Sequence, residues 1–186
     1  MDRRKSLRMI GAGAIVLANS SFSPIISTHE SELKQEKSKV AFQERWHGLR
    51  QHTFEVFGAM PNDQFDFQPT EEVMSYGNLF CHIGWSLDIY AEVLDGTKKI
   101  DKLDSNDKNR VSNYLQSRFD RFEEAMSNAF GERLYLVDHH FSKVEPWKNF
   151  TNYDVLMLSY NHAVHHKGQA TTYLRLKGIV PPKYRF

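Results

Sequence analysis

The sequence predicts an all-α protein, a bundle of four helices. Four segments of about twenty residues each carry apolar side chains at the three- and four-residue spacing of helices. No segment shows the alternating pattern of a hairpin or the strand–helix–strand order of a parallel sheet. Amphipathic helices of this kind bury their apolar faces against one another. The connections before the second and fourth helices are long, which argues against a simple up-down-up-down order.

The first expected helix covers residues 38–60. Trp46 and Phe57 lie on its apolar stripe, and Pro61 ends it, because proline removes a backbone donor. The segment before it, residues 21–37, is polar and contains a proline. We therefore expect a linker at 21–37 that leads into one folded domain at 38–186.

The second expected helix covers residues 76–94. Ser75 precedes it, and a serine in this position accepts a hydrogen bond from a free backbone N–H of the first turn. Gly96 follows it and suits the left-handed conformation that commonly ends a helix. Both ends of this helix are therefore marked in the sequence.

The third and fourth expected helices cover residues 105–130 and 152–177. The third has apolar residues on one stripe and is followed by Gly131. The fourth ends at Gly178, and Pro181 follows shortly after, which is the usual order of these two residues past a helix.

The first twenty residues differ from the rest of the chain. A basic stretch at 3–8 precedes an apolar run at 9–18 that is too short to span a bilayer stably. The order resembles a twin-arginine export signal. We expect residues 1–20 to be an export signal and the mature protein to be periplasmic, without a stable membrane span. The alternative is a short N-terminal membrane anchor.

Charge and cysteine content exclude several classes of site. Without residues 1–20 the chain has 20 Lys and Arg against 22 Asp and Glu, a formal charge of −2. Nucleic-acid binding requires clustered positive charge, so we expect no nucleic-acid partner. Cys81 is the only cysteine, which excludes an intramolecular disulfide and a zinc site built on thiolates. Any metal must be held by His, Asp or Glu.

Three of the nine histidines cluster in NHAVHHKGQ, within the fourth expected helix. The helical spacing places them on one stripe with other residues, and we expect this stripe to face the interior, because residues between them, such as Lys167, are more polar. The stripe consists of Leu158, His162, His165, His166, Gln169 and Tyr173. Buried imidazoles without partners are costly, and a metal ion removes that cost. His162 and His166 are one turn apart, the spacing at which one helix supplies two ligands. Spacing alone does not decide between His165 and His166.

A third ligand is expected from the second helix. His82 lies on its apolar stripe and should point inward. Three protein ligands would leave a fourth position for water or substrate, as in catalytic zinc sites. Zinc is the preferred ion, with nickel as the other candidate.

The remaining candidates are weaker. Glu44 and His47 form a Glu-x-x-His motif, but carboxylate-bridged di-iron bundles need that motif on two helices, and there is no second copy. His139 and His140 fall in an irregular connection and are expected to be solvated. Cys81 is expected to be a packed thiol of the core.

The NLFCHIGW segment followed by NHAVHHKGQATTYLRLKGIVPP resembles the DinB/YfiT-like family of proposed metalloenzymes, over nearly the whole mature chain. The resemblance implies a four-helix bundle in up-down-down-up order with a three-histidine metal centre. It implies His82, His162 and His166 as ligands and places His165 away from the metal. Characterised members are similar to transferases and isomerases that use low-molecular-weight thiols.

The leading hypothesis is a metal-dependent enzyme that acts on a small molecule by hydrolysis or thiol transfer. His165 would then be a candidate for acid–base chemistry, and Gln169 and Tyr173 candidates for substrate binding. The alternative is a non-catalytic metal-binding or stress-response bundle in which the ion joins two helices. The sequence leaves open whether the protein is a homodimer.

Overall fold

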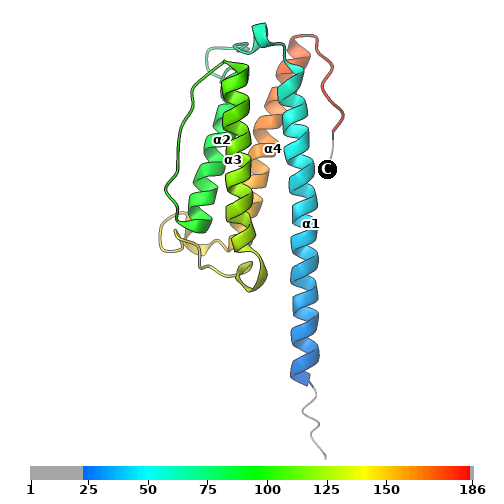
Figure 1. Ribbon diagram of the computed structural model, residues 1–186, viewed down its shortest axis with the longest axis vertical. Coiled ribbons are helices and arrows are strands. Elements are labelled where there is room, and N and C mark those ends of the chain that lie inside the picture. Colours follow the sequence, from blue (N-terminus) through cyan, green and yellow to red (C-terminus); the bar gives the residue numbers. More distant parts are fainter. Residues whose placement is uncertain (1–22, 185–186) are drawn as a thin grey trace, which may run out of the picture.

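The structure is a computed structural model that describes residues 23–184, and of residues 23–29 only the backbone. Its four long helices are α1 (Ser23–Ala59), α2 (Tyr76–Asp95), α3 (Lys108–Ala129) and α4 (Asn152–Leu176) (Figure 1). Short 3₁₀ turns lie in the connections between them. No strand occurs in the part of the chain that is described, and the all-α prediction is confirmed. The expected export signal, residues 1–20, lies outside the described residues.

The four helices follow the expected up-down-down-up order (Figure 1). α2 runs antiparallel to α1, the connection 96–107 returns along the length of the bundle, and α3 then runs parallel to α2. The side chain of Ser75, before α2, hydrogen-bonds that of Asn106, before α3, at 2.7 Å. This contact holds the first turns of both helices at the same end of the bundle.

Local signals fix both ends of α2. The Ser75 hydroxyl accepts a hydrogen bond from the backbone N–H of Asn78, and Gly96 ends the helix with φ of 74°. That backbone conformation strains any residue with a Cβ. The predicted cap residues of α2 are therefore confirmed, and they set which side chains of α2 face the neighbouring helices.

α1 begins earlier than the sequence pattern predicted. The helix starts at Ser23 and runs without a break through residues 23–37 of the segment that was expected to be a linker, and Figure 1 shows this part projecting beyond the bundle. Pro24 occupies the first turn, where a missing N–H costs nothing, and residues 30–37 are rich in Glu and Lys, which favour helix. Local propensity, rather than burial, accounts for the extension.

Aromatic side chains fill the interior. Trp46 of α1 is 2% exposed and packs on Phe119 and Phe122 of α3, with ring centroids 5.7 and 4.6 Å apart. Its indole N–H donates to the Glu123 carboxylate at 3.0 Å. This packing anchors α1 against α3 and leaves the facing sides of α2 and α4 to build the site.

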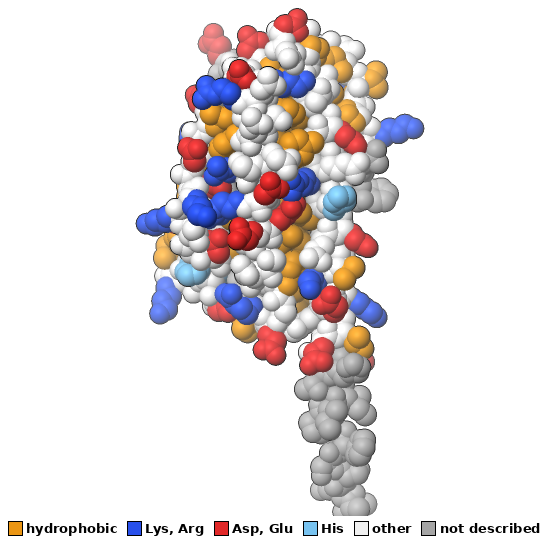
Figure 2. Space-filling model, in the orientation of Figure 1, with side chains coloured by type: hydrophobic (Ala, Val, Ile, Leu, Met, Phe, Trp, Pro, Cys, Tyr) orange, Lys and Arg blue, Asp and Glu red, His pale blue; other side chains and the backbone are white. Residues whose placement is uncertain are grey.

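The surface seen in Figure 2 carries Lys and Arg side chains interspersed with Asp and Glu, without a large field of one sign. Among residues 23–184, no helix has a stretch both long and apolar enough to cross a bilayer.

Candidate metal centre

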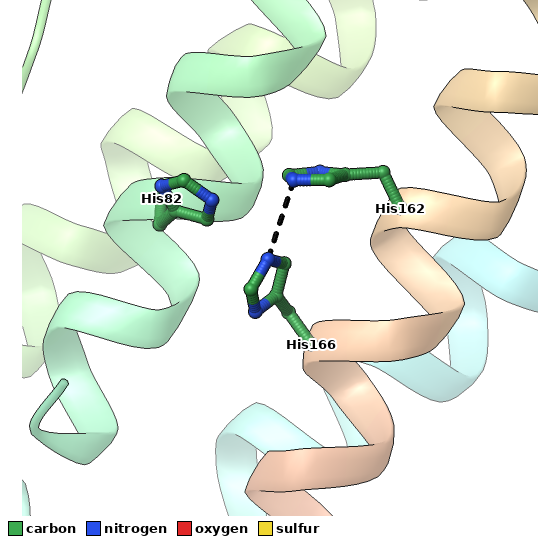
Figure 3. A group of neighbouring side chains, drawn as sticks. All are labelled: His82, His162 and His166. Atoms are coloured by element: carbon green, nitrogen blue, oxygen red, sulfur yellow. Dashed lines mark hydrogen bonds between the residues drawn. The ribbon is translucent and has the colours of Figure 1, made fainter. Parts of the chain in front are cut away.

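The candidate site lies between α2 and α4. His82 comes from the second turn of α2 and is half-buried. His162 and His166 are one turn apart on α4, whose start is fixed by a reciprocal pair of hydrogen bonds between Thr151 and Asp154. The three imidazoles point into the same space between the two helices (Figure 3). The four-residue spacing places His162 and His166 on one face of α4, and the packing of α2 on α4 brings His82 next to them.

The distances within this group suit one metal ion. Each of the three histidines offers a nitrogen, and these nitrogens all lie within 4.8 Å of one another. The Nε2 atoms of His162 and His166 are 3.2 Å apart. Two nitrogens bound tetrahedrally to zinc at its usual bond length are separated by about 3.3–3.4 Å. The pair on α4 is therefore spaced as ligands of a single ion.

Burial keeps the three imidazoles neutral. It lowers the pKa of His162 to about 4, with the neighbouring imidazoles as further causes. Burial is likewise the first cause of the lowered pKa of His82 and of His166. Neutral imidazole is the form that binds metals, so near neutral pH no proton has to leave these rings before an ion binds.

Gln169 sets the tautomer of His166. The amide oxygen of Gln169 can only accept, so the contact of 2.9 Å requires that His166 Nδ1–H donates to it. The lone pair of His166 then lies on Nε2, the nitrogen that faces His162. The amide N–H of Gln169 in turn donates to His165 Nε2 at 3.2 Å. Gln169 thus orients the ring of His166 through its amide oxygen.

His162 supplies a test of whether a metal fits. Its Nδ1 is buried and has no hydrogen-bond partner within the described part of the chain, while its Nε2 faces the lone pair of His166 Nε2. Two facing ring nitrogens share one proton at most, whereas one cation satisfies both lone pairs. Among residues 30–184, no carboxylate or thiol joins the three-histidine group. The donor set fits a divalent ion with an open position.

A cleft of about 220 Å³ opens beside His82. It lies between the first half of α2 and the connection that follows this helix, and its walls are partly apolar and partly polar. The lining residues are Met74, Asn78, Cys81, His82, Trp85, Lys102, Leu103 and Asp104. One of the three histidines is therefore reachable from a small surface cleft.

Aromatic rings lie beside the three-histidine group. The ring of Tyr90 lies 6.1 Å from that of His162, and the ring of Trp147 lies 6.1 Å from that of Tyr90. Trp85 lies 5.5 Å from His82 on the cleft side. Aromatic rings therefore lie next to two of the three histidines.

The other predicted site residues have defined positions. His165 was expected on the inward-facing stripe of α4 but is exposed and lies outside the three-histidine group, because adjacent helix residues point about 100° apart and His166 takes the inward position. Tyr173 is 7% exposed, packs on Phe67 and donates its hydroxyl hydrogen to the carbonyl of Met74 at 3.1 Å. The polar groups of Gln169 and Tyr173 form hydrogen bonds within the protein, and substrate binding by these two residues stays a prediction.

Two further expectations about polar residues were wrong. Lys167 was expected on the outer side of α4 but is 3% exposed, with its ammonium group 5.4 Å from the ring centroid of Tyr184, because the C-terminal segment folds back over this side of the helix. His139 was expected to be solvated but is 1% exposed, and its Nε2 hydrogen-bonds the carbonyl of Phe150 at 3.0 Å.

Of the weaker candidates, Glu44 and His47 are both exposed on α1, and the thiol of Cys81 is buried as expected. Lys102, Asp104 and Trp85 line the cleft but were not predicted as site residues. A lysine and an aspartate in a polar connection carry no signal in the sequence that they face a cleft.

Comparison with known proteins agrees with the fold. The model of the DinB family matches residues 33–186. Among solved structures, a DinB-like protein from Bacillus subtilis, YjoA, is similar with a TM-score of 0.57 and 20% sequence identity, over 78% of this chain and 98% of that one. No curated protein matches the sequence. At this identity the likeness to YjoA concerns the fold alone.

Proposed function

This chain belongs to the DinB family, and we propose that it is a metal-dependent enzyme in which His82, His162 and His166 bind one divalent ion. The observation that carries the proposal is the convergence of three imidazoles from two helices, with nitrogens within 4.8 Å of one another. Zinc is the ion we propose, with nickel as the alternative, because neutral imidazole suits both.

The surroundings of the site favour catalysis on a small molecule. A divalent ion held by three imidazoles supplies a Lewis acid with an open position, which activates a water or a thiol and polarises a carbonyl. Trp85 and Tyr90 place aromatic rings beside His82 and His162, and Gln169 holds His166 in the ligand tautomer. The cleft beside His82 gives the substrate its approach. We therefore propose hydrolysis or thiol transfer, with His165, hydrogen-bonded to Gln169, as the candidate for proton transfer.

A non-catalytic metal-binding or stress-response bundle is the second candidate. The observation in its favour is that the histidines come from both α2 and α4, so that an ion would link these helices. The two functions differ in the open position. An ion that exchanges an added thiol or azide supports catalysis, whereas an ion that binds neither supports a structural role.

Elemental analysis of the purified protein tests the metal site. We expect about one zinc or nickel per chain, and its loss in His82→Ala and in His166→Ala. His47→Ala is the matched control, because His47 is exposed on α1 and far from the group in sequence. A wild-type protein that neither contains a metal nor takes one up on reconstitution contradicts the proposal.

We also propose that the protein is exported to the periplasm, on the basis of the basic and apolar pattern of residues 1–20. Cell fractionation tests this. The protein should move to the cytosolic fraction when Arg3 and Arg4 are both replaced by lysine, because a twin-arginine pathway reads the arginine pair. A wild-type protein found in the cytosol would contradict export, and one retained with the membrane would support the uncleaved anchor.

A further inference from the structure

Two opposite charges lie in the cleft beside His82. Lys102 and Asp104 both line it, and both belong to the connection that runs from α2 to α3. Neither was part of the metal site, and neither contributes to the packing of the core, since both side chains are exposed. Two opposite charges beside a candidate metal site suit the binding of a charged ligand.

Lys102 is held over one wall of the cleft. Its ammonium group lies 5.7 Å from the ring centroid of Trp85, a distance at which a cation and an indole ring attract each other. The pKa of His82 is lowered by burial, then by His166 and then by Lys102, which places the ammonium group within electrostatic reach of the imidazole. A positive charge thus lies over Trp85 in the cleft that His82 also lines.

Asp104 brings a negative charge to the same cleft. Burial raises the pKa of the Cys81 thiol to about 11, and the Asp104 carboxylate contributes to this shift, so the carboxylate lies near the thiol in the cleft wall. Among residues 30–184, whose side chains are described, Lys102 and Asp104 form no ion pair with each other or with a third residue. Both charges are therefore available to a bound molecule.

We propose that the substrate is a small zwitterion of the amino-acid type. Its carboxylate would lie at Lys102, its ammonium group at Asp104, and a third polar group would reach the metal position beside His82. A cleft of about 220 Å³ is smaller than the ~300–1,000 Å³ of sites for drug-sized ligands, which fits a molecule of this size. The inference rests on the proposed function, because it needs the ion to bind the third group.

Three thiols that differ only in their charged groups test the proposal. L-Cysteine carries both charges, 3-mercaptopropionate lacks the ammonium group, and cysteamine lacks the carboxylate. Each is titrated into the cobalt-loaded full-length protein, and binding is read from the thiolate-to-cobalt absorption rather than from activity. We expect L-cysteine to bind tightest.

Variants assign each charge to its partner. Lys102→Ala should weaken L-cysteine and 3-mercaptopropionate about fivefold, the order expected for a solvent-exposed ion pair, and leave cysteamine unchanged. Asp104→Asn should weaken L-cysteine and cysteamine by a similar factor and leave 3-mercaptopropionate unchanged. Chelation of the metal by the amine cannot produce this dependence on the variants. Lys98→Ala, exposed on the same connection and outside the cleft, is the matched control and should bind all three as the wild type does.

The possible failures are distinct. If cobalt binds and the affinities of all three thiols do not depend on Lys102 or Asp104, the zwitterion site is overturned and the metal centre stands. The same conclusion follows if one variant weakens all three thiols equally. A protein that takes up no cobalt overturns the proposed function and this inference together.

Discussion

Helix α2 directs a polar side chain toward each of two neighbouring helices, Asp88 toward α3 and His82 toward α4. Asp88 is fully buried. Its carboxylate accepts hydrogen bonds from Arg118 at 2.7 Å and from the backbone N–H of Asp101 at 3.3 Å, and Arg121 lies 3.9 Å away. The α2–α3 contact therefore supplies its own counter-charges.

Close packing also seals the α2–α3 contact. A Cβ at Gly84 would lie 2.6 Å from the ring of Tyr114, so only glycine fits where the two helices meet. At the α2–α4 contact, by contrast, three imidazoles face one another and a cleft opens beside His82. Both contacts bury polar atoms. At the α2–α3 contact groups of opposite charge face one another, whereas at the α2–α4 contact three imidazole nitrogens converge without an opposite charge. That difference separates a structural polar cluster from a binding site.

Breaking the Asp88 cluster should give the largest loss of stability. Asp88→Ala removes the carboxylate that pairs with Arg118 and one of the two carboxylates beside Arg121. Both arginines are largely buried, and we expect the free energy of unfolding to fall by about 3 kcal/mol. Urea denaturation of the metal-free protein measures it. Glu124→Ala, exposed on α3, should change stability little. If Asp88→Ala abolished metal binding by the folded protein while stability held, the separation of the two regions would be wrong.

Metal should stabilise only through the α2–α4 contact. At a free zinc concentration one hundred times its dissociation constant, the free energy of unfolding of the wild type should rise by about 2.7 kcal/mol. Thermal or urea denaturation with and without zinc measures this rise. His82→Ala should lose most of it, because one of the three ligands is gone. An equal rise in His82→Ala would place the zinc elsewhere.

Gln169 should matter to metal affinity more than to folding. Gln169→Leu removes the acceptor that holds the Nδ1–H of His166, and we expect zinc affinity to fall about tenfold, or ~1.4 kcal/mol. Competition with a chromophoric chelator measures the affinity. Gln169→Glu keeps an acceptor at this position and should retain most of the affinity. Equal losses in both variants would argue against the role of the hydrogen bond.

The stability of the metal-free protein should depend weakly on pH through the histidines. Because burial lowers the pKa of His162 from its usual 6.5 to about 4, the unfolded chain binds the proton more tightly than the folded chain between these values. The free energy of unfolding should therefore fall as the pH is lowered from 6.5 to 4. We expect about 1 kcal/mol from this group, since solvent screens a half-buried ring.

Urea denaturation at a series of pH values checks this dependence. His162→Gln should show a smaller fall than the wild type over the same range, and carboxylates that titrate at low pH contribute equally to both proteins. Parallel curves for the two proteins would show that His162 is not held neutral by the fold.

The helices and part of the site followed from local sequence. The caps Ser75 and Gly96 fixed both ends of α2, and the four-residue spacing of His162 and His166 placed both rings on one face of α4. The helical extension of α1 through residues 23–37 was missed, because its polar composition resembles a linker although its individual residues favour helix.

Tertiary structure decided the rest. The periodicity of one helix does not show which side chain of another helix will contact its histidine pair. The contact of His82 with His162 and His166 depends on how α2 packs against α4. The burial of Lys167 depends on where the C-terminal segment folds, and the positions of Lys102 and Asp104 depend on the path of a connection without regular structure. The sequence by itself determined that this protein is an all-helical bundle with two histidines one turn apart, since helix periodicity is a local property. Only the packing of distant segments determined that these histidines share their space with His82, and that His82 lines a cleft with two charged residues.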